Sequence, residues 1–385
     1  MEGIYIGLMS GTSLDAIDAV AIQIDQSKVI LLNSLSSPIP SSIRQSILAL
    51  CRSGPDEIHQ SMTLDRIMGE SFATTVLQLL DQANLEPRHI TAIGSHGQTI
   101  RHYPFGSEAY SLQIGDPNTI AERTGILTVA DFRRRDIAAG GQGAPLIPLF
   151  HKTLLLDKTP QAAVLNIGGM ANFSAFDSSG SLIGCDTGPG NVLLDAWIQQ
   201  HRGFNYDTNG VWAQNGELDT RLLERMLRDE YFALPPPKST GRERFNLDWI
   251  QRILRDHEAA TGYSMAPQSV QTTLTELTAL SIANELKRLP EIHTLFCCGG
   301  GARNDYLLSR IQTALRTFYP QSRVCSTDEV GLPADWIEAM GFAWFAYRTL
   351  SHHSCSLAAV TGATHDCVTG GIYPGKRRVT VRFEE

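Results

Sequence analysis

Four glycine-rich segments of this chain carry polar side chains of the kind that bind phosphates or move protons. The first, 7–18, mixes glycines, hydroxyl side chains and two aspartates. Glycine lets a backbone approach a ligand closely, and hydroxyls and amides can point at phosphate oxygens. Asp15 and Asp18 could hold a magnesium ion through water, because Mg²⁺ uses few carboxylates and keeps several waters. A simple hairpin turn is the alternative for this segment taken alone.

The second and third segments lie in the second half of the chain. Segment 166–172 has two adjacent glycines, and together with the first segment it could grip a polyphosphate, although it could also be a plain turn. Segment 185–191 follows an apolar stretch and precedes a helical pattern. Its Asp186 is either a carboxylate base for phosphoryl transfer or, with Thr187, a cap of that helix.

The fourth segment, 298–304, places three glycines between a strand pattern and a helix pattern. Its bare backbone could lie against a nucleotide base or ribose, but a tight strand-to-helix turn explains the same residues. The chain contains no Gly-x4-Gly-Lys-Ser/Thr, so a Walker-type phosphate loop is excluded. The glycines also lack the spacing of a dinucleotide-binding motif.

Three further polar stretches stand out at 94–99, 131–136 and 235–243. The arginines of the second stretch could bind a carboxylate with two hydrogen bonds, or they could form a solvated charge cluster. The third stretch is too polar and too stiff for a hydrophobic core. We expect it to be a rigid surface loop, or a lid that contributes Lys238 and Arg242.

The elements that must position these segments alternate between strands and helices. Apolar runs predict strands at 4–8, 19–24, 29–32, 91–94, 127–130, 162–166, 172–176, 182–185 and 294–298. Helical patterns occupy 42–51, 58–83, 116–124, 218–228, 274–289, 305–315 and 336–348. Each half opens with a glycine-tipped hairpin, which predicts α/β layering in a duplicated architecture with a cleft between the halves.

Length and composition indicate a folded protein of two domains. The chain has 385 residues, of which 42% are hydrophobic and 19% are charged. Its formal net charge of −8 argues against nucleic-acid binding. The seven scattered cysteines predict reduced thiols in a cytoplasmic protein. Residues 1–14 lack a basic leader region and no apolar run is long enough for a bilayer, so we expect neither a signal peptide nor a membrane span.

Eight segments in their order resemble the anhydro-N-acetylmuramic acid kinase family: 7–18, 94–99, 130–145, 166–172, 186–191, 235–246, 299–304 and 359–363. Together they extend over nearly the whole chain. The resemblance implies the sugar-kinase, actin and heat-shock-chaperone superfamily. The expected fold is therefore α/β, with two ribonuclease-H-like (actin-like ATPase) domains flanking a central cleft. We expect 1–130, completed by 357–385, to form the first domain, and 131–356 to form the second with nucleotide and sugar-site loops.

The same resemblance implies a reaction. ATP, water and 1,6-anhydro-N-acetylmuramate would give N-acetylmuramate 6-phosphate and ADP, in the recycling of cell-wall peptidoglycan. Asp186 would be the catalytic base. The residues implied for ATP and phosphate binding are Gly11, Thr12, Ser13, Leu14, Asp15, Ala16, Ile17, Asp18, Gly168, Gly169, Gly299, Gly300, Gly301 and Asn304. Those implied for the amino-sugar substrate are His96, Gln98, Arg133 and Glu329. The resemblance also implies Mg²⁺ without direct protein ligands, and a cytoplasmic homodimer.

Two other functions stay open at this point. Another small-molecule kinase or a phosphatase of the same superfamily would keep the phosphate loops but would not need 131–145 or 235–246. A non-catalytic, ATP-driven binding module would not need a base at Asp186 and should carry an added peptide-binding domain. The chain departs from the family at Ala16, where glycine is usual. Because alanine disfavours positive φ, a backbone contact to phosphate there would be weakened.

Overall fold

The computed structural model describes residues 2–11, 14–25, 28–236, 238–356 and 358–376. The chain forms two compact units: unit 1 is Met1–Phe150 with Trp336–Glu385, and unit 2 is His151–Asp335. Segments 131–150 and 336–356, which the sequence analysis assigns to the second domain, therefore lie in unit 1.

Unit 1 is built on a seven-stranded sheet with the order β12-β6-β4-β1-β2-β3, in which β5 also pairs with β4. Strands β1 to β3 form an antiparallel meander, β4 and β6 continue parallel to β1, and β12 is antiparallel to β6. The strands are β1 (Gly3–Ser10), β2 (Ala16–Asp25), β3 (Lys28–Pro38), β4 (Ile90–Tyr103), β5 (Tyr110–Ile114), β6 (Thr128–Ala130) and β12 (Gly371–Tyr373).

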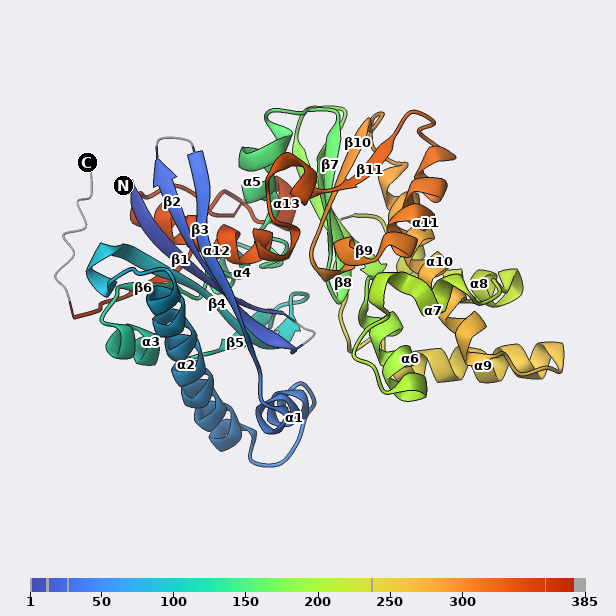
Figure 1. The fold of residues 1–385 in the computed structure, drawn as a ribbon, viewed down its shortest axis with the longest axis horizontal. Coiled ribbons are helices and arrows are strands. Elements are labelled where there is room, and N and C mark those ends of the chain that lie inside the picture. Colours follow the sequence, from blue (N-terminus) through green and yellow to red (C-terminus); the bar gives the residue numbers. More distant parts are fainter. Residues whose placement is uncertain (1, 12–13, 26–27, 237, 357, 377–385) are drawn as a thin grey trace. The chain divides into compact units, whose positions relative to one another are not determined.

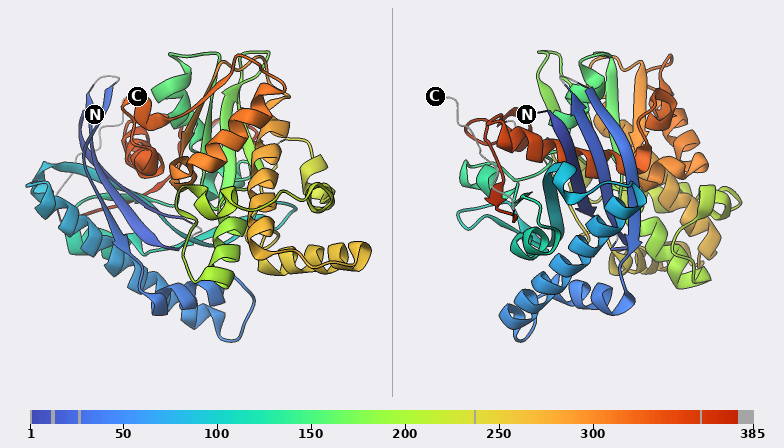
Figure 2. Two further views of the ribbon diagram at one scale, coloured as in Figure 1. Left: turned by 45° about the vertical axis from the view of Figure 1, so that its right-hand side comes forward. Right: turned by 60° about the vertical axis from the view of Figure 1, so that its left-hand side comes forward.

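Helices cover both faces of this sheet (Figure 1). They are α1 (Ser41–Leu50), α2 (Glu57–Gln82), α3 (Pro117–Thr124), α4 (Arg134–Ala138), α12 (Ile337–Leu350) and α13 (Ala358–Thr361). Side chains alternate along a strand, so Ile6 and Leu8 of β1 point to one face, where they join a core cluster with α1 and α2. Helix α12 packs against the same strand through residues of the opposite face, and Figure 2 shows the same arrangement from two further sides.

Two glycines explain why 336–356 belongs to unit 1. Gly7 of β1 and Gly94 of β4 are neighbours in the parallel ladder. A Cβ atom at Gly7 would lie 1.8 Å from the carbonyl oxygen of Ala339, and one at Gly94 would lie 1.9 Å from that of Phe342. The missing side chains let α12 lie directly on the sheet. Gly7 therefore serves helix packing rather than a ligand.

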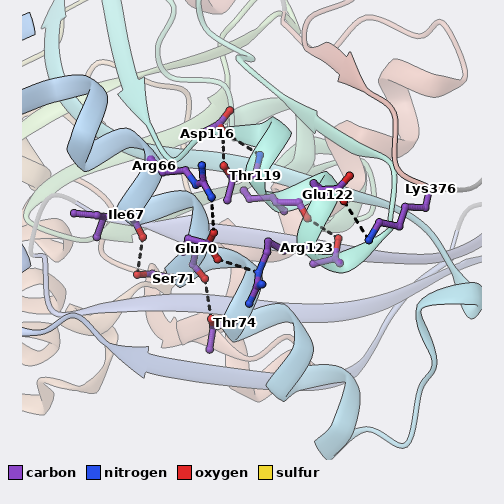
Figure 3. A network of polar contacts seen from close by, with 12 residues as sticks. Arg66, Ile67, Glu70, Ser71, Thr74, Asp116, Thr119, Glu122, Arg123 and Lys376 are labelled. Atoms are coloured by element: carbon purple, nitrogen blue, oxygen red, sulfur yellow. Dashed lines mark hydrogen bonds and ion pairs between the residues drawn. The ribbon is translucent and has the colours of Figure 1, made fainter. Parts of the chain in front are cut away.

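A polar network joins α2, α3 and the C-terminal segment on the surface of unit 1 (Figure 3). Glu70 of α2 pairs with Arg66 at 3.1 Å and with Arg123 of α3 at 3.0 Å. Lys376 pairs with Glu122 at 3.2 Å. These side chains are largely exposed, and such pairs contribute about 1 kcal/mol or less each. The network therefore contributes little to the stability of unit 1.

Unit 2 is built on a five-stranded sheet with the order β11-β10-β7-β8-β9. Its strands are β7 (Ala162–Ile167), β8 (Met170–Phe176), β9 (Leu182–Pro189), β10 (Thr294–Cys298) and β11 (Arg323–Ser326). Strands β7 to β9 form an antiparallel meander, and β10 and β11 continue parallel to β7. Unit 1 repeats this order in β3-β2-β1-β4-β6, so the predicted α/β class with two ribonuclease-H-like domains is confirmed. The predicted central cleft stays a prediction.

Most helices of unit 2 gather around β9 and the long helix α10. They are α6 (Val192–Arg202), α7 (Val211–Gln214), α8 (Thr220–Leu227), α9 (Leu247–Thr261), α10 (Pro267–Leu286) and α11 (Asp305–Arg316), with α5 (Pro148–His151) and a π-helical turn at Lys152–Leu156 entering the unit. Short 3-10 turns occur in both units, at Pro87–His89, Thr208–Gly210, Glu230–Ala233, Gly300–Arg303, Thr327–Val330 and Ala334–Trp336. Helix α10 is buried along most of its length, because it packs against β9 and against helices on several sides. Within the described ranges, no helix has the length and apolar character needed to cross a membrane.

Candidate active site

Asp186 lies inside strand β9, not at the start of a helix. Helix α6 begins at Val192 with Asn191 as its N-cap residue, so the alternative that Asp186 caps this helix is wrong. The strand is longer than predicted because its ladder with β8 continues beyond the apolar run. In that ladder Asp186 stands opposite Asn172, and the second and third predicted segments therefore meet.

Three hydrogen bonds fix Asp186, and all of them come from the chain just beyond η4 (Glu230–Ala233) or from η4 itself. The Thr240 amide donates to Oδ2 of Asp186 at 2.9 Å. The Asp186 amide donates to the Lys238 carbonyl at 3.1 Å, and the Tyr231 hydroxyl donates to the Asp186 carbonyl at 2.8 Å. A carboxylate that accepts from a backbone amide is favoured in its charged form and held in one orientation. Asp186 is half-buried, so its carboxylate is both oriented and reachable.

The segment 234–246 is packed more deeply than the sequence predicts; its residue 237 lies outside the described part. Lys238 is buried and forms an ion pair with Glu285 of α10 at 2.6 Å. Phe245 is fully buried and Arg242 is half-buried. Residues 234–236 and 243 are exposed, as expected of a surface loop, but the expectation that the segment offers Lys238 is wrong. The reason is the buried carboxylate of Glu285 on α10, which is 47 residues from Lys238 in the sequence.

The glycine turn between β7 and β8 is tied to the start of α6. The Asn191 amide donates to the Gly168 carbonyl at 2.8 Å, and the Gly190 amide donates to the Gly169 carbonyl at 2.9 Å. The Asn191 side chain donates to the Ile167 carbonyl at 3.2 Å. A Cβ atom at Gly168 would meet nothing closer than 3.6 Å, so this position has open space beside it.

The three consecutive glycines after β10 differ in what their missing side chains do. Gly299 has a φ of +77°, and a Cβ atom there would lie 2.4 Å from Oδ1 of Asn166. A Cβ atom at Gly301 would lie 2.3 Å from Cγ2 of Ile167. At Gly300 the nearest atom would be 3.9 Å away. Gly299 and Gly301 therefore serve packing, and Gly300 leaves space that a ligand can use.

Asn304, predicted to bind nucleotide, has a structural task in this chain. Its Oδ1 accepts a hydrogen bond from the Leu307 amide at 2.9 Å, which makes it the N-cap of α11. The turn that precedes it packs on the end of β7. Segments 166–172, 185–191 and 298–304 are thus brought together in unit 2.

The first predicted segment is a hairpin tip in unit 1, and Thr12 and Ser13 lie outside the described residues. Gly11 follows β1, and its carbonyl accepts from the Leu14 amide at 3.2 Å. Leu14 is buried in the core although its φ is +60°, a conformation that bulky residues rarely adopt. The side chain of Leu14 anchors the tip, and its backbone supplies the positive φ.

The other residues of this segment lie at the start of β2 or inside it. Ala16 pairs with Pro38 in extended conformation, so the concern about positive φ at Ala16 is wrong. Ile17 is buried in the core, whereas Asp15 is exposed. Oδ1 of Asp18 accepts from the hydroxyl of Ser36 in β3 at 2.7 Å. Among the residues described, no three His, Cys, Asp or Glu side chains gather as a metal site.

Two of the predicted sugar residues form one rigid arrangement in unit 1. Nε and Nη2 of Arg133 donate to Nε2 of His96 at 3.1 and 2.9 Å, and Nη1 donates to the Gly143 carbonyl at 2.7 Å. Nδ1 of His96 donates to the Gly97 carbonyl at 2.8 Å. Burial, together with the charge of Arg133, holds the pKa of His96 well below its ordinary value. A neutral His96 therefore accepts from Arg133 and sets the direction of its guanidinium.

Gln98 and Glu329 have different surroundings. Gln98 is buried in unit 1, and its Oε1 accepts from the hydroxyl of Ser10 at 2.6 Å. Ser10 lies at the end of β1 within the first predicted segment, but it was not singled out from the sequence. Glu329 lies in unit 2 on η6 (Thr327–Val330), is exposed, and pairs with Arg323.

Asp136 is a second residue that the sequence analysis missed. It is fully buried in unit 1. Its Oδ2 accepts from the Gly143 amide and its Oδ1 accepts from the Thr361 hydroxyl, both at 2.7 Å. The resemblance segments 130–145 and 359–363 are thus joined. No pattern in the sequence distinguishes this aspartate from the charged residues around it.

Comparisons with known proteins identify relatives over nearly the whole chain. Residues 3–375 match the family model for anhydro-N-acetylmuramic acid kinase. An anhydro-N-acetylmuramic acid kinase of Saccharophagus degradans is 46% identical over 373 residues, which cover 96% of this chain and 98% of the relative.

The solved structures that match are more distant in sequence. The activator of the 2-hydroxyisocaproyl-CoA dehydratase from Clostridium difficile with bound ADPNP matches with a TM-score of 0.45 and 11% identity, covering 90% of this chain and 94% of that one. A ROK family glucokinase from Streptomyces griseus in complex with glucose and AMPPNP matches with a TM-score of 0.39 and 12% identity, covering 90% of this chain and 100% of that one.

Proposed function

The chain belongs to the anhydro-N-acetylmuramic acid kinase family, and we propose that it opens 1,6-anhydro-N-acetylmuramate with water and phosphorylates O6 with ATP. The products are N-acetylmuramate 6-phosphate and ADP. The observation that supports this most is the carboxylate of Asp186, oriented by the Thr240 amide in strand β9. The match over nearly the whole chain disfavours the alternative of another small-molecule kinase of the superfamily.

Asp186 acts as the base in this proposal. It takes a proton from water as the water oxygen forms a bond to C1 of the sugar and the C1–O6 bond breaks. The released O6 then forms a bond to the γ-phosphorus of ATP, and the bond to the β-phosphate oxygen breaks to release ADP. One base is enough, because the rest of the barrier is lowered by positioning and electrostatic stabilisation. A half-buried carboxylate with a fixed orientation fits this task.

ATP is bound by glycine turns in this proposal. In unit 2, Gly168 and Gly300 have open space where a side chain would stand, and a nucleotide can lie against such backbone. In unit 1, Gly11 to Asp18 is assigned to phosphate. Asp15 and Asp18 would contact Mg²⁺ through water, because this ion uses few carboxylates and Asp18 already accepts from Ser36. The ion would neutralise charge on the phosphates.

The sugar residues have separate tasks. The guanidinium of Arg133, held by His96 and Gly143, is assigned to the carboxylate of the substrate's lactyl group, because Arg matches carboxylates with paired hydrogen bonds. Gln98 and Glu329 are assigned to sugar hydroxyl or amide groups.

The cellular setting follows from the substrate, which is a fragment of bacterial cell wall. We assign the protein to peptidoglycan recycling in the cytoplasm, as a homodimer. The seven cysteines, none in a disulfide and six of them buried, support a reducing compartment.

A coupled assay of ADP release tests the function. With ATP and magnesium, we expect turnover that depends on 1,6-anhydro-N-acetylmuramate and yields N-acetylmuramate 6-phosphate. Glucose and N-acetylglucosamine serve as control sugars. ADP release that ignores the anhydrosugar, or that prefers a control sugar, would contradict the assignment.

A further inference from the structure

Unit 2 buries an ion pair close to Asp186 in its core. Lys238 and Glu285 are each 3% exposed in their side chains, and Nζ lies 2.6 Å from Oε1. Nζ also donates to the Tyr231 carbonyl at 3.3 Å and lies 4.7 Å from the centre of the Tyr231 ring. Burying two charges costs several kcal/mol, and apolar replacements of similar volume are often as stable. Stability alone is therefore a poor reason for this pair.

The backbone around Lys238 contacts both the amide and the carboxylate of Asp186. The Lys238 carbonyl accepts from the Asp186 amide, and two residues later the Thr240 amide donates to the Asp186 carboxylate. The side chain of Lys238 points away to Glu285 on α10. A shift of Lys238 would therefore move both hydrogen bonds on Asp186 together.

Other contacts hold the C-terminal end of the segment 234–246. Arg244 donates to Oδ1 of Asp229 from Nε at 2.9 Å and from Nη2 at 2.6 Å. Trp249 donates to Oδ2 of the same aspartate at 2.9 Å, and Phe245 packs edge-on against Trp249. These anchors do not involve Glu285. The segment can therefore stay folded when the ion pair is removed, while its middle, next to Asp186, loses its attachment to α10.

We propose that the Lys238–Glu285 ion pair positions the carboxylate of Asp186, through the Lys238 carbonyl and the Thr240 amide. The pair is a positioning device and does not touch substrate. The inference rests on the proposed role of Asp186 as base. A displacement of less than about 1 Å is enough to matter, because reacting groups must be held to about 0.5 Å.

The test compares Lys238→Met and Glu285→Gln with Glu276→Gln in the sugar-dependent ADP-release assay. Glu276 is a matched control, because it lies on the same helix and pairs with Arg310 at 2.6 and 3.0 Å. We expect the first two variants to lower kcat by about 10- to 100-fold while KM for ATP changes less than about twofold. Glu276→Gln should keep the wild-type kcat. If all three variants lose activity only in proportion to lost folded protein, the pair is merely structural.

The acidic limb of the pH profile separates positioning from a direct effect of charge. Loss of the Thr240 hydrogen bond disfavours the carboxylate and raises the pKa of Asp186, so both variants should move the limb upward, by about one pH unit. A charge acting through space would raise the pKa in Lys238→Met but lower it in Glu285→Gln. A downward shift in Glu285→Gln would overturn the proposal.

Two other titratable groups near Asp186 do not contribute to the acidic limb of the pH profile. Burial, and next the charge of Glu285, raises the pKa of Cys185 to about 12. Burial, and next the charge of Asp186, raises the pKa of Tyr231 further above its ordinary value.

Two controls keep the outcomes separate. Circular dichroism and the thermal midpoint establish that each variant is folded, and Glu285→Gln, which preserves shape, carries the test if Lys238→Met fails to fold. Asp186→Asn is assayed in parallel. If it turns over like the wild type, the proposed base is wrong. If it is inactive while both pair variants keep wild-type kcat, only the positioning inference falls.

Discussion

Strands β3 and β9 occupy the same place in their two sheets, as the outer strand of the antiparallel meander. Strand β3 is exposed or half-buried along its whole length, and its Ser36 hydroxyl donates a hydrogen bond to Asp18. Strand β9 is mostly buried, because α10 and η4 pack on it, and it carries Asp186. The comparison teaches that strand position alone does not make a base. The covering layer supplies the fixed donors and the drier surroundings that a positioned carboxylate needs.

The largest effect that would sharpen this comparison is expected from Asp186→Asn. Removal of the base should lower kcat by about 10²- to 10⁴-fold, because general base catalysis contributes that much. Affinity for ATP, measured by calorimetry, should change little, since Asp186 is not assigned to the nucleotide. Asp177→Asn, in the turn before β9, is the control and should behave like the wild type. Comparable turnover in the two variants would mean that Asp186 of β9 does not act as the base.

The glycines after β10 provide the next test, because one strand end combines packing and binding positions. Gly301→Ala should destabilise the protein by about 1–3 kcal/mol, since its Cβ would overlap Ile167. Gly300→Ala should leave the thermal midpoint nearly unchanged, with a cost within about 0.5 kcal/mol, and should raise KM for ATP. Scanning calorimetry and initial rates measure the two effects. A stable Gly301→Ala would contradict the packing role of Gly301. A Gly300→Ala with unaltered KM would contradict the proposed contact between Gly300 and ATP.

Buried histidines should give both units a similar pH dependence. Burial lowers the pKa of His151 in unit 2 to about 3, and burial together with Arg133 lowers that of His102 in unit 1 to about 4. Because the unfolded chain takes up protons near pH 6.5 and the folded chain does not, stability is full above that pH. It should fall as the pH decreases toward the folded values, by on the order of 1 kcal/mol per pH unit for each histidine.

Urea unfolding at pH 7.5 and 5.5 measures this loss. His151→Gln removes one of these groups and should make the loss smaller, whereas the exposed His59→Gln should not. Equal pH dependence in the wild type and in His151→Gln would mean that His151 is charged in the folded protein.

The smallest effect is expected on the exposed strand. Ser36→Ala removes one exposed hydrogen bond to Asp18, so it should cost about 0.5 kcal/mol or less and keep kcat within about twofold. Urea unfolding and the ADP-release assay provide both values. A large loss of kcat would break the comparison, because β3 would then contribute to the site by orienting Asp18.

Local patterns in the sequence predicted most of the strands and helices near the site. The apolar runs of β1, β7 and β10, each followed by glycine, marked the positions where the chain turns sharply, and Asp186 was recognised from its place after such a run. The short strands β5, β11 and β12 were missed, because none has a long apolar run. Helix α9 was missed although Ile250, Ile253 and His257 have helical spacing. Helix α4 begins within the polar stretch 131–136, where no helix was predicted.

Contacts between distant residues could not be predicted. Lys238 looked like a surface residue because its partner, Glu285, is 47 residues away. The domain boundaries depended on Gly7 and Gly94, whose role is visible only once α12 lies on the sheet. Glycine has the same signal in a sequence whether it makes room for a helix or for a phosphate.

The most direct test of the proposed reaction is to run it in H₂¹⁸O and to trap the sugar product by reduction before its anomeric oxygen exchanges. Hydrolytic opening with transfer to O6 predicts one ¹⁸O atom at C1 and none in the phosphate of N-acetylmuramate 6-phosphate, as read by mass spectrometry. An ¹⁸O label that appears in inorganic phosphate, with the anhydrosugar unchanged, would mean that water attacks ATP instead. That result would contradict the account of Asp186 as the base that opens the sugar.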